Sequence, residues 1–282
     1  MNLKVGDIVS RRSYGGDILF KIIEINRSSQ TALLKGIHVR LLADSPLEDL
    51  YTPERKSIYE KQEKYRGKAR ECVAQIFKSR NMNREKQMRG GNEENYYEIP
   101  GKVLHLDGDQ DYLNECMKIY RNLDITAEGI FIPERRQPVH IKELLKKHKP
   151  DILILTGHDA YLKGKKNYQD INNYRNSKYF VHATTIARTY EPSKDSLVIF
   201  AGACQSHYEQ LLAAGANFAS SPQRVLIHAL DPVFISERIA NTSFRRTINI
   251  SEVINNTISG MDGLGGIETK GTFRFGIPKS PY

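Results

Sequence analysis

Two short apolar runs, each followed closely by a reactive side chain, constrain the fold of this chain most strongly. The run DILILT precedes Gly157-His158, and LVIF ends shortly before Cys204. Neither run alternates between apolar and polar residues, which is typical of strands buried on both faces of a parallel sheet. Because parallel strands present their carboxyl ends at one edge of a sheet, we expect His158 and Cys204 to lie close together there.

Strand-like and helix-like segments alternate from residue 100 onward. The strand-like runs are KVLHLD, AEGIFI, DILILT and LVIF, and amphipathic segments lie between them. This alternation predicts an α/β fold, with a three-layer αβα arrangement around a parallel sheet. After Pro232 we expect two short helices and a glycine-rich stretch, GLGGIETKG.

The first hundred residues have a different character. Residues 1–50 contain short β-rich runs (VGDIV, DILFKIIEI, TALLKGI and VRLLA) separated by turn residues, which favours a small SH3-like β-barrel module. Residues 51–99 are dense in Lys, Arg and Glu and predict a charged helical linker, with Cys72 on its apolar side and Gly90-Gly91-Asn92 at its end. We therefore expect three parts, 1–50, 51–99 and 100–282, the last being the α/β domain that carries His158 and Cys204.

Composition excludes several classes of protein. At 282 residues and 39% hydrophobic content the chain can form a core, yet no run reaches the roughly 18 apolar residues of a membrane span. The N-terminus lacks the pattern of a secretory signal, and three cysteines without CxxC spacing indicate neither a disulfide framework nor a zinc site. We expect a cytoplasmic protein with no cofactor and no metal. The net charge of +9 indicates either an acidic partner or simply solubility.

The two strand ends together indicate a cysteine nucleophile and its base. Cys204 stands between small residues and a following helix, whose N-terminus would lower the thiol pKa. Its own main-chain N–H could stabilise an oxyanion. His158 could take the thiol proton and later protonate the leaving amine. His207 is a rival base that we expect to point away from the thiol.

The arrangement resembles the caspase-like cysteine peptidases, in which an apolar block precedes His-Gly and a second block precedes Ala-Cys. Here the blocks lead to Gly157-His158 and Ala203-Cys204. The chain departs from that pattern at Asp159, which stands in place of glycine. In those enzymes the amide after the histidine contributes to the oxyanion hole, so the resemblance implies that role for the Asp159 N–H.

A closer resemblance extends over nearly the whole chain. The chain resembles the YabG family of sporulation-specific peptidases of Firmicutes in VGDIVSRRSYGGDILFKI, PGKVLHLDGD, KPDILILTGHDAY, IFAGACQSH, AGANFASSP, IHALDP and GLGGIETKG. The resemblance implies a cysteine protease of the mother cell that trims coat and cortex-associated proteins at the forming spore coat. Carried over to this sequence, Cys204 is the nucleophile and His158 the general base.

The substrate specificity is inferred from the loop after the first strand of the α/β region. In caspase-like folds this loop helps to line the pocket for the residue before the cut, and here it carries Asp107 and Asp109. Two carboxylates suit a basic side chain, which predicts cleavage after Arg or Lys. Weaker pocket candidates follow a later short strand: Asn217, Ser220 and Ser221.

Two other functions are consistent with parts of the sequence. A non-catalytic assembly protein that binds nucleic acid or the spore coat would use the β module and the basic linker, although no aromatic-rich RNA-binding motif is present. A nucleotide enzyme is excluded, because GLGG lies near the C-terminus and neither GxGxxG nor GxxxxGK[ST] occurs.

Overall fold

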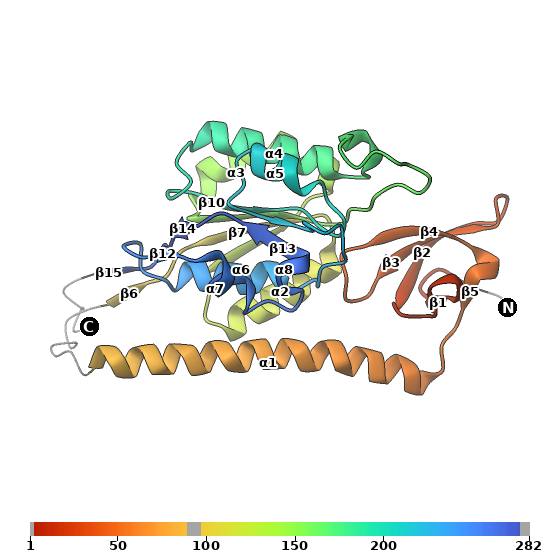
Figure 1. Ribbon diagram of the computed structural model, residues 1–282, viewed down its shortest axis with the longest axis horizontal. Helices are drawn as coiled ribbons and strands as arrows, with labels where there is room; N and C mark the ends of the chain where they lie inside the picture. Colours follow the sequence, from red (N-terminus) through yellow and green to blue (C-terminus); the bar gives the residue numbers. More distant parts are fainter. Residues whose placement is uncertain (1–2, 89–96, 277–282) are drawn as a thin grey trace.

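The fold consists of a central sheet flanked by helices, a separate antiparallel sheet at one end, and a long helix running beneath both (Figure 1). The structure is a computed structural model, and it describes residues 3–88 and 97–276.

The central sheet is parallel except at one edge. Its order is β13-β11-β10-β9-β7-β8, and only the β11–β13 pair is antiparallel. The expected parallel sheet is thus confirmed, while GLGG contributes to an antiparallel edge strand. The strands are β7 (Val103–Asp107), β8 (Ala127–Phe131), β9 (Ile152–Thr156), β10 (Val198–Ala201), β11 (Phe218–Ser220) and β13 (Leu264–Gly266).

Helices cover both faces of this sheet (Figure 1). One face packs under α3 (Gln137–His148), α4 (Ser177–Tyr190) and α5 (Tyr208–Ala213). The other packs on α2 (Gln110–Asn122), α6 (Asp231–Ala240) and α7 (Ile250–Ile254), and the short α8 (Gly260–Gly263) leads directly into β13. Alternate residues of β9 therefore enter two different apolar clusters, which explains its unbroken apolar sequence. Two small pairs complete this part: β12 (Thr247–Ile248) with β14 (Thr269–Lys270), and β6 (Tyr97–Ile99) with β15 (Arg274–Gly276).

The N-terminal sheet is antiparallel, in the order β4-β3-β2-β1-β5. Its strands are β1 (Ile8–Arg11), β2 (Phe20–Asn26), β3 (Thr31–Gly36), β4 (Leu42–Pro46) and β5 (Leu50–Tyr51). The strand expected from VRLLA is wrong in its first half, since β4 begins only at Leu42. Residues 39–41 instead bridge to the α/β part, Val39 to His228 and Leu41 to Asp159. The reason is that the Arg40 N–H pairs with the Ile227 carbonyl and the Arg40 carbonyl with the Asp159 N–H.

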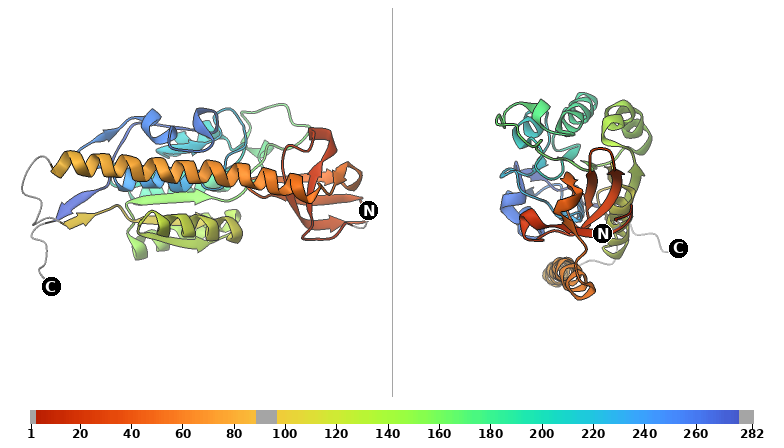
Figure 2. Two further views of the ribbon diagram at one scale, coloured as in Figure 1. Left: turned by 90° about the horizontal axis from the view of Figure 1, so that it is seen from below. Right: turned by 90° about the vertical axis from the view of Figure 1, so that its right-hand side faces the viewer.

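The long helix α1 (Arg55–Met88) runs along the molecule from the N-terminal sheet past the central sheet (Figure 2). Few of residues 55–81 of this helix are buried, but Cys72 and Ile76 join the apolar cluster that includes α2 and α6. The expected helix and the buried position of Cys72 are confirmed. The expected end at Gly90-Gly91-Asn92 lies outside the described residues. Within residues 3–88 and 97–276, no helix combines the length and apolarity needed to cross a membrane.

A glycine sets the turn that leads from β10 to Cys204. Gly202 has φ of +110°, and an added Cβ would lie 2.3 Å from Ser220 Oγ and 2.9 Å from Leu211 Cδ1. Gly164 also has a positive φ, +81°, but nothing lies within 4 Å of its added Cβ. A side chain at position 202 therefore introduces both a steric clash and backbone strain, whereas one at position 164 introduces backbone strain alone.

We expect Gly202→Ala to lower the free energy of unfolding by about 2–4 kcal/mol, because strain and a clash with packed side chains add together. Gly164→Ala is the matched control and should cost only about 1 kcal/mol, from strain alone. Chemical denaturation measures both. Equal losses in the two variants would contradict the steric account of the turn.

Candidate active site

The strand order brings three polar loop segments to one edge of the central sheet. Strands β7, β9 and β10 are adjacent, and their carboxyl ends lead to Asp107, His158 and Cys204 respectively. The expectation that these strand ends meet is confirmed. All three side chains are buried, Asp107 and Cys204 completely.

His158 lies between two carboxylates. Its Nδ1 is 3.2 Å from Glu134 Oε1, and its main-chain N–H donates to the same oxygen at 2.8 Å. Its Nε2 is 3.2 Å from Asp109 Oδ2, but it forms no hydrogen bond with the described residues. Burial lowers the pKa of His158, but Asp109 and Glu134 outweigh burial and leave the pKa raised. The pair of carboxylates therefore makes the imidazole a stronger base than a free histidine.

Cys204 lies in the turn between β10 and α5. Its Sγ accepts a hydrogen bond from the Ile227 N–H at 3.3 Å, and its side chain packs with Val39 and Ile227. Complete burial raises the pKa of the thiol to about 12, although the N–H groups of Ile227 and Arg40 and the Arg40 charge act in the opposite direction. The expected lowering of the thiol pKa by a helix N-terminus is wrong here, because α5 begins only at Tyr208. The thiol is neutral in this arrangement.

Asp159 stands where the caspase-like pattern has glycine, and its side chain and its backbone amide have different partners. Its buried carboxylate accepts hydrogen bonds from the hydroxyls of Ser177 and Ser206, the latter at 2.9 Å, and from the Asn176 N–H. The side chain thus joins the loop after β9 to the turn that carries Cys204. The Asp159 N–H points the other way and donates to the Arg40 carbonyl oxygen at 3.4 Å.

Arg40, from the N-terminal part of the chain, fills the space beside Asp107. Its NH1 donates to Asp107 Oδ2 at 2.8 Å, and its Nε and NH2 donate to the Ala229 carbonyl oxygen at 3.2 and 2.7 Å. The guanidinium also lies over the Tyr112 ring, 5.2 Å from its centroid. Every side-chain atom of this pair is excluded from solvent. Asp107, the Ala229 carbonyl and Tyr112 thus form a pocket, here called the arginine pocket, that the Arg40 side chain fills and that matches its charge.

The two loop aspartates have different partners. Asp107 binds Arg40, whereas Asp109 caps α2 through the Tyr112 N–H at 2.9 Å and forms an ion pair with Lys35 Nζ at 2.8 Å. Burial raises the pKa of Asp109, but His158 and Lys35 outweigh burial and hold it well below its usual range. Asp109 is an ionised neighbour of His158, and the guanidinium pairs with Asp107 instead.

The other candidates from the sequence form structural hydrogen bonds. His207 Nε2 is 3.0 Å from the Gln169 carbonyl oxygen, and no described contact joins His207 to Cys204. The three weaker pocket candidates are buried and hold neighbouring loops: Asn217 binds the Ile199 N–H, Ser220 the Ala203 carbonyl, and Ser221 the Val225 carbonyl.

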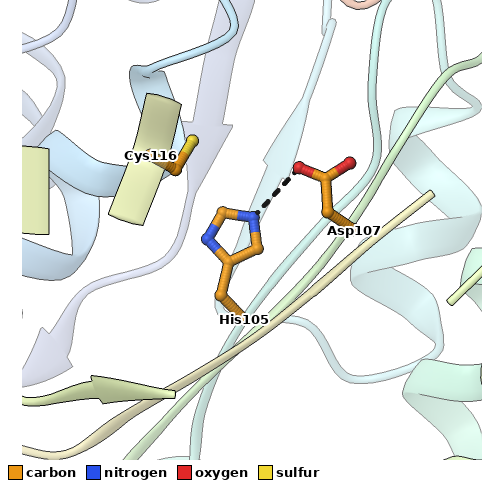
Figure 3. Close-up of side chains that lie close together, drawn as sticks. All are labelled: His105, Asp107 and Cys116. Atoms are coloured by element: carbon orange, nitrogen blue, oxygen red, sulfur yellow. Dashed lines mark ion pairs between the residues drawn. The ribbon is translucent and has the colours of Figure 1, made fainter. Parts of the chain in front are cut away.

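Three potential metal ligands lie near the arginine pocket. Figure 3 shows His105 and Asp107 pointing toward one another, with Cys116 on a neighbouring helix. Their ligand atoms lie within 4.8 Å of one another. The Arg40 guanidinium, however, already forms an ion pair with the Asp107 carboxylate, and its NH2 lies 3.5 Å from Cys116 Sγ. We interpret the cluster as a wall of the arginine pocket, because this fixed cation repels a metal ion.

Sequence reasoning missed Glu134 and Arg40. Glu134 follows β8 in a short 3-10 helix, and nothing in its local sequence separates it from an exposed turn residue. Arg40 had a visible signal, because it is a lone charge inside the apolar run of Ile37–Leu42, and a buried arginine requires a partner.

An open cleft continues from the site. It has a volume of about 450 Å³ and lies between the N-terminal sheet and the loop after His158. Its lining includes Leu41, Ala160, Tyr161, Gln205 and Leu226. The cleft begins where the chain leaves Arg40, at Leu41.

Comparisons with known proteins identify relatives over almost the full length. The family described as "YabG peptidase U57" matches residues 4–278. The chain is 46% identical over 286 aligned positions to the "Sporulation-specific protease YabG" of Bacillus subtilis (strain 168), covering 99% of both chains. No solved structure matches.

Two histidines stack beside the segment that carries Arg40. The His38 ring lies 4.7 Å from the Tyr65 ring and 6.3 Å from the His228 ring, measured between centroids. Burial lowers the pKa of His228 to about 3, and the nearby charges of His38, Arg40 and Lys68 add to this effect. The fold therefore requires neutral His228.

We expect acid to destabilise the protein through His228. Because its folded pKa lies below the unfolded value, its contribution is present above pH 6.5 and is lost as pH falls toward 3. Between pH 7 and pH 4 this loss is on the order of 3 kcal/mol. Urea titrations at both pH values should show a smaller decrease for His228→Gln than for the wild type. His182→Gln, on the exposed side of α4, is the control, and an identical decrease in all three proteins would contradict the assignment.

Proposed function

Because the chain belongs to the YabG peptidase U57 family, we propose that it is a sporulation-specific cysteine endopeptidase that uses Cys204 as nucleophile and His158 as general base. One observation carries this proposal. A peptide segment of the chain, residues 39–41, lies across the strand ends with its Arg40 carbonyl facing the Asp159 amide and its side chain in the Asp107 pocket. That placement is the one a substrate would need.

The proposed reaction follows from these positions. The Cys204 thiol transfers its proton to His158, and the thiolate attacks the carbonyl carbon of the residue seated where Arg40 lies. The Asp159 and Cys204 N–H groups stabilise the oxyanion, and the latter has no partner among the described residues. His158 then protonates the leaving amine. Water, deprotonated by His158, hydrolyses the thioester and releases the new carboxyl terminus and the free thiol.

Glu134 is proposed as the positioning residue of this reaction. It accepts from Nδ1 of His158 and directs the other ring nitrogen, Nε2, away from itself. No described hydrogen bond joins His158 to Cys204, and the thiol sulfur instead accepts a hydrogen bond from the Ile227 N–H. The proposed proton transfer therefore requires the thiol to turn from Ile227 toward the imidazole when a substrate enters.

The proposed specificity is cleavage after Arg or Lys. Asp107 supplies the ionic contact, and the Ala229 carbonyl accepts two further guanidinium hydrogen bonds. The planar guanidinium of arginine can donate to the Asp107 carboxylate and the Ala229 carbonyl together. The ammonium group of lysine forms fewer of these hydrogen bonds, so arginine is preferred over lysine. Asp109, which we expected in the same pocket, is assigned to the His158 side of the site.

The remaining parts of the proposal concern the biological setting and the architecture. The proposed substrates are spore coat and cortex-associated proteins, processed in the mother-cell cytoplasm at the forming coat. The name of the Bacillus subtilis relative supports the link to sporulation. We also propose that the α/β part, residues 100–282, has a caspase-like topology. Residues 1–50 would be an SH3-like module and 51–99 a linker.

The nucleophile assignment is tested by mapping new peptide termini in a denatured protein mixture by mass spectrometry. The wild type should generate new termini, and Cys204→Ala and His158→Ala should lose them by at least a thousandfold in rate. His207→Ala is the matched control and should retain most of the activity. Identical products from the wild type and Cys204→Ala would remove the nucleophile assignment.

The specificity is tested with fluorogenic peptides that differ only in the residue before the cut. We expect the highest kcat/KM for Arg, a lower value for Lys, and at least a hundredfold lower values for Asp and Leu, because these leave the Asp107 carboxylate buried and unpaired. Equal turnover of the Arg, Asp and Leu peptides would exclude the proposed pocket.

A further inference from the structure

The segment that occupies the proposed substrate position belongs to the chain itself. Residues 37–41 connect β3 to β4 of the N-terminal sheet, and the Arg40 N–H donates to the Ile227 carbonyl at 3.3 Å. Val39 bridges to His228 on one side, and Leu41 bridges to Asp159 on the other. These are the backbone contacts by which an extended peptide adds to the edge of a binding site.

The side chain of Arg40 leaves no room for another basic residue. Its relative exposure is 0%, and it takes the ionic contact of Asp107 and both hydrogen bonds to Ala229. A substrate arginine would need the same acceptors. Binding of the two is therefore mutually exclusive.

We propose that Val39–Leu41 is a built-in inhibitor of this enzyme: Arg40 fills the pocket reserved for the substrate's basic side chain and keeps the site closed until the loop withdraws. The proposal rests on the proposed function, since it names the regulation of the same site. The Arg40 side chain competes with substrate for the pocket, and it is present at a high local concentration because it belongs to the same polypeptide chain.

Contacts on both sides of Arg40 hold the loop in place. The Tyr112 hydroxyl hydrogen-bonds to the carbonyl oxygens of Gly36 and Val39, the latter at 2.7 Å. Lys35 forms an ion pair with Asp109, the neighbour of His158. His38 stacks on Tyr65 of α1. The loop is thus presented by a rigid scaffold rather than laid on the surface.

Breakage of the chain at Arg40 would not by itself open the site. Strands β3 and β4 flank the loop and pair along five positions, from Thr31–Pro46 to Lys35–Leu42. These pairs would hold residues 1–40 and the rest of the chain together, with Arg40 still in its pocket. Relief therefore depends on removal of the Arg40 side chain from Asp107, and a substitution at this one residue isolates that step.

The first test compares kcat/KM for an Arg-containing fluorogenic peptide in the wild type, Arg40→Ala and Arg27→Ala. Arg27 is exposed in the β2–β3 turn of the same sheet and controls for the change in charge. We expect Arg40→Ala to exceed the wild type by at least tenfold and Arg27→Ala to equal it. A kcat/KM of Arg40→Ala that does not exceed that of an active wild type would overturn the proposal.

The second test measures pocket occupancy without activity. In a Cys204→Ala background, calorimetry should show that N-acetyl-arginine amide binds the Arg40→Ala variant and not the chain that retains Arg40. N-acetyl-citrulline amide, which lacks the charge, should bind neither. No binding to the Arg40→Ala variant would overturn the proposal. Binding as expected, with no peptide cleavage by any variant, would leave the blocked pocket standing and reject the peptidase mechanism instead.

A third variant covers the case in which Arg40→Ala fails to fold because Asp107 loses its partner. Arg40→Lys keeps a positive charge beside Asp107 but offers only a single ammonium group. A folded Arg40→Lys protein should cleave the peptide faster than the wild type and bind N-acetyl-arginine amide measurably. Activity and binding equal to those of the wild type would overturn the proposal.

Discussion

The buried ion pair between Arg40 and Asp107 joins the N-terminal sheet to the α/β core, and the arrangement of the site depends on it. Both side chains are fully excluded from solvent. Removing two charges from water is costly, and the loss of one partner of such a pair typically costs about 3–5 kcal/mol, because the other charge stays buried. Here additional acceptors at Ala229 and the face of Tyr112 complete the surroundings of the guanidinium. The pair therefore fixes where the loop of residues 37–41 must lie.

The same ion pair positions the backbone of residues 39–41 at the candidate site. The guanidinium draws the Arg40 backbone against the Asp159 amide and places it over the turn that holds Cys204. Burial, to which Val39 of this segment and Ile227 both contribute, raises the pKa of the thiol, while the carboxylates around His158 raise the pKa of the imidazole. With residues 39–41 in place, the thiol is therefore neutral. In the proposed mechanism the thiol becomes reactive only when solvent and substrate replace the loop.

Much of the fold could be predicted from the sequence, for a local reason. Strands such as ILIL, at residues 152–155, are apolar on both faces, so a parallel sheet covered by two helical layers follows from composition and length. The strand predicted from VRLLA was wrong at its start, because the residues that pair with this segment, His228 and Asp159, are more than a hundred residues away along the chain. Local pattern carries no information about a pairing of that separation.

The sequence by itself determined which side chains reach the edge of the sheet: Asp107, His158 and Cys204 each follow a recognisable strand. Only the tertiary structure decided what each one contacts there. Glu134 reaches His158 across 24 residues, and Arg40 reaches Asp107 across 67, through a loop of the other sheet. The physical reason is that strand formation depends on near neighbours, whereas burial and charge pairing depend on the whole packed chain.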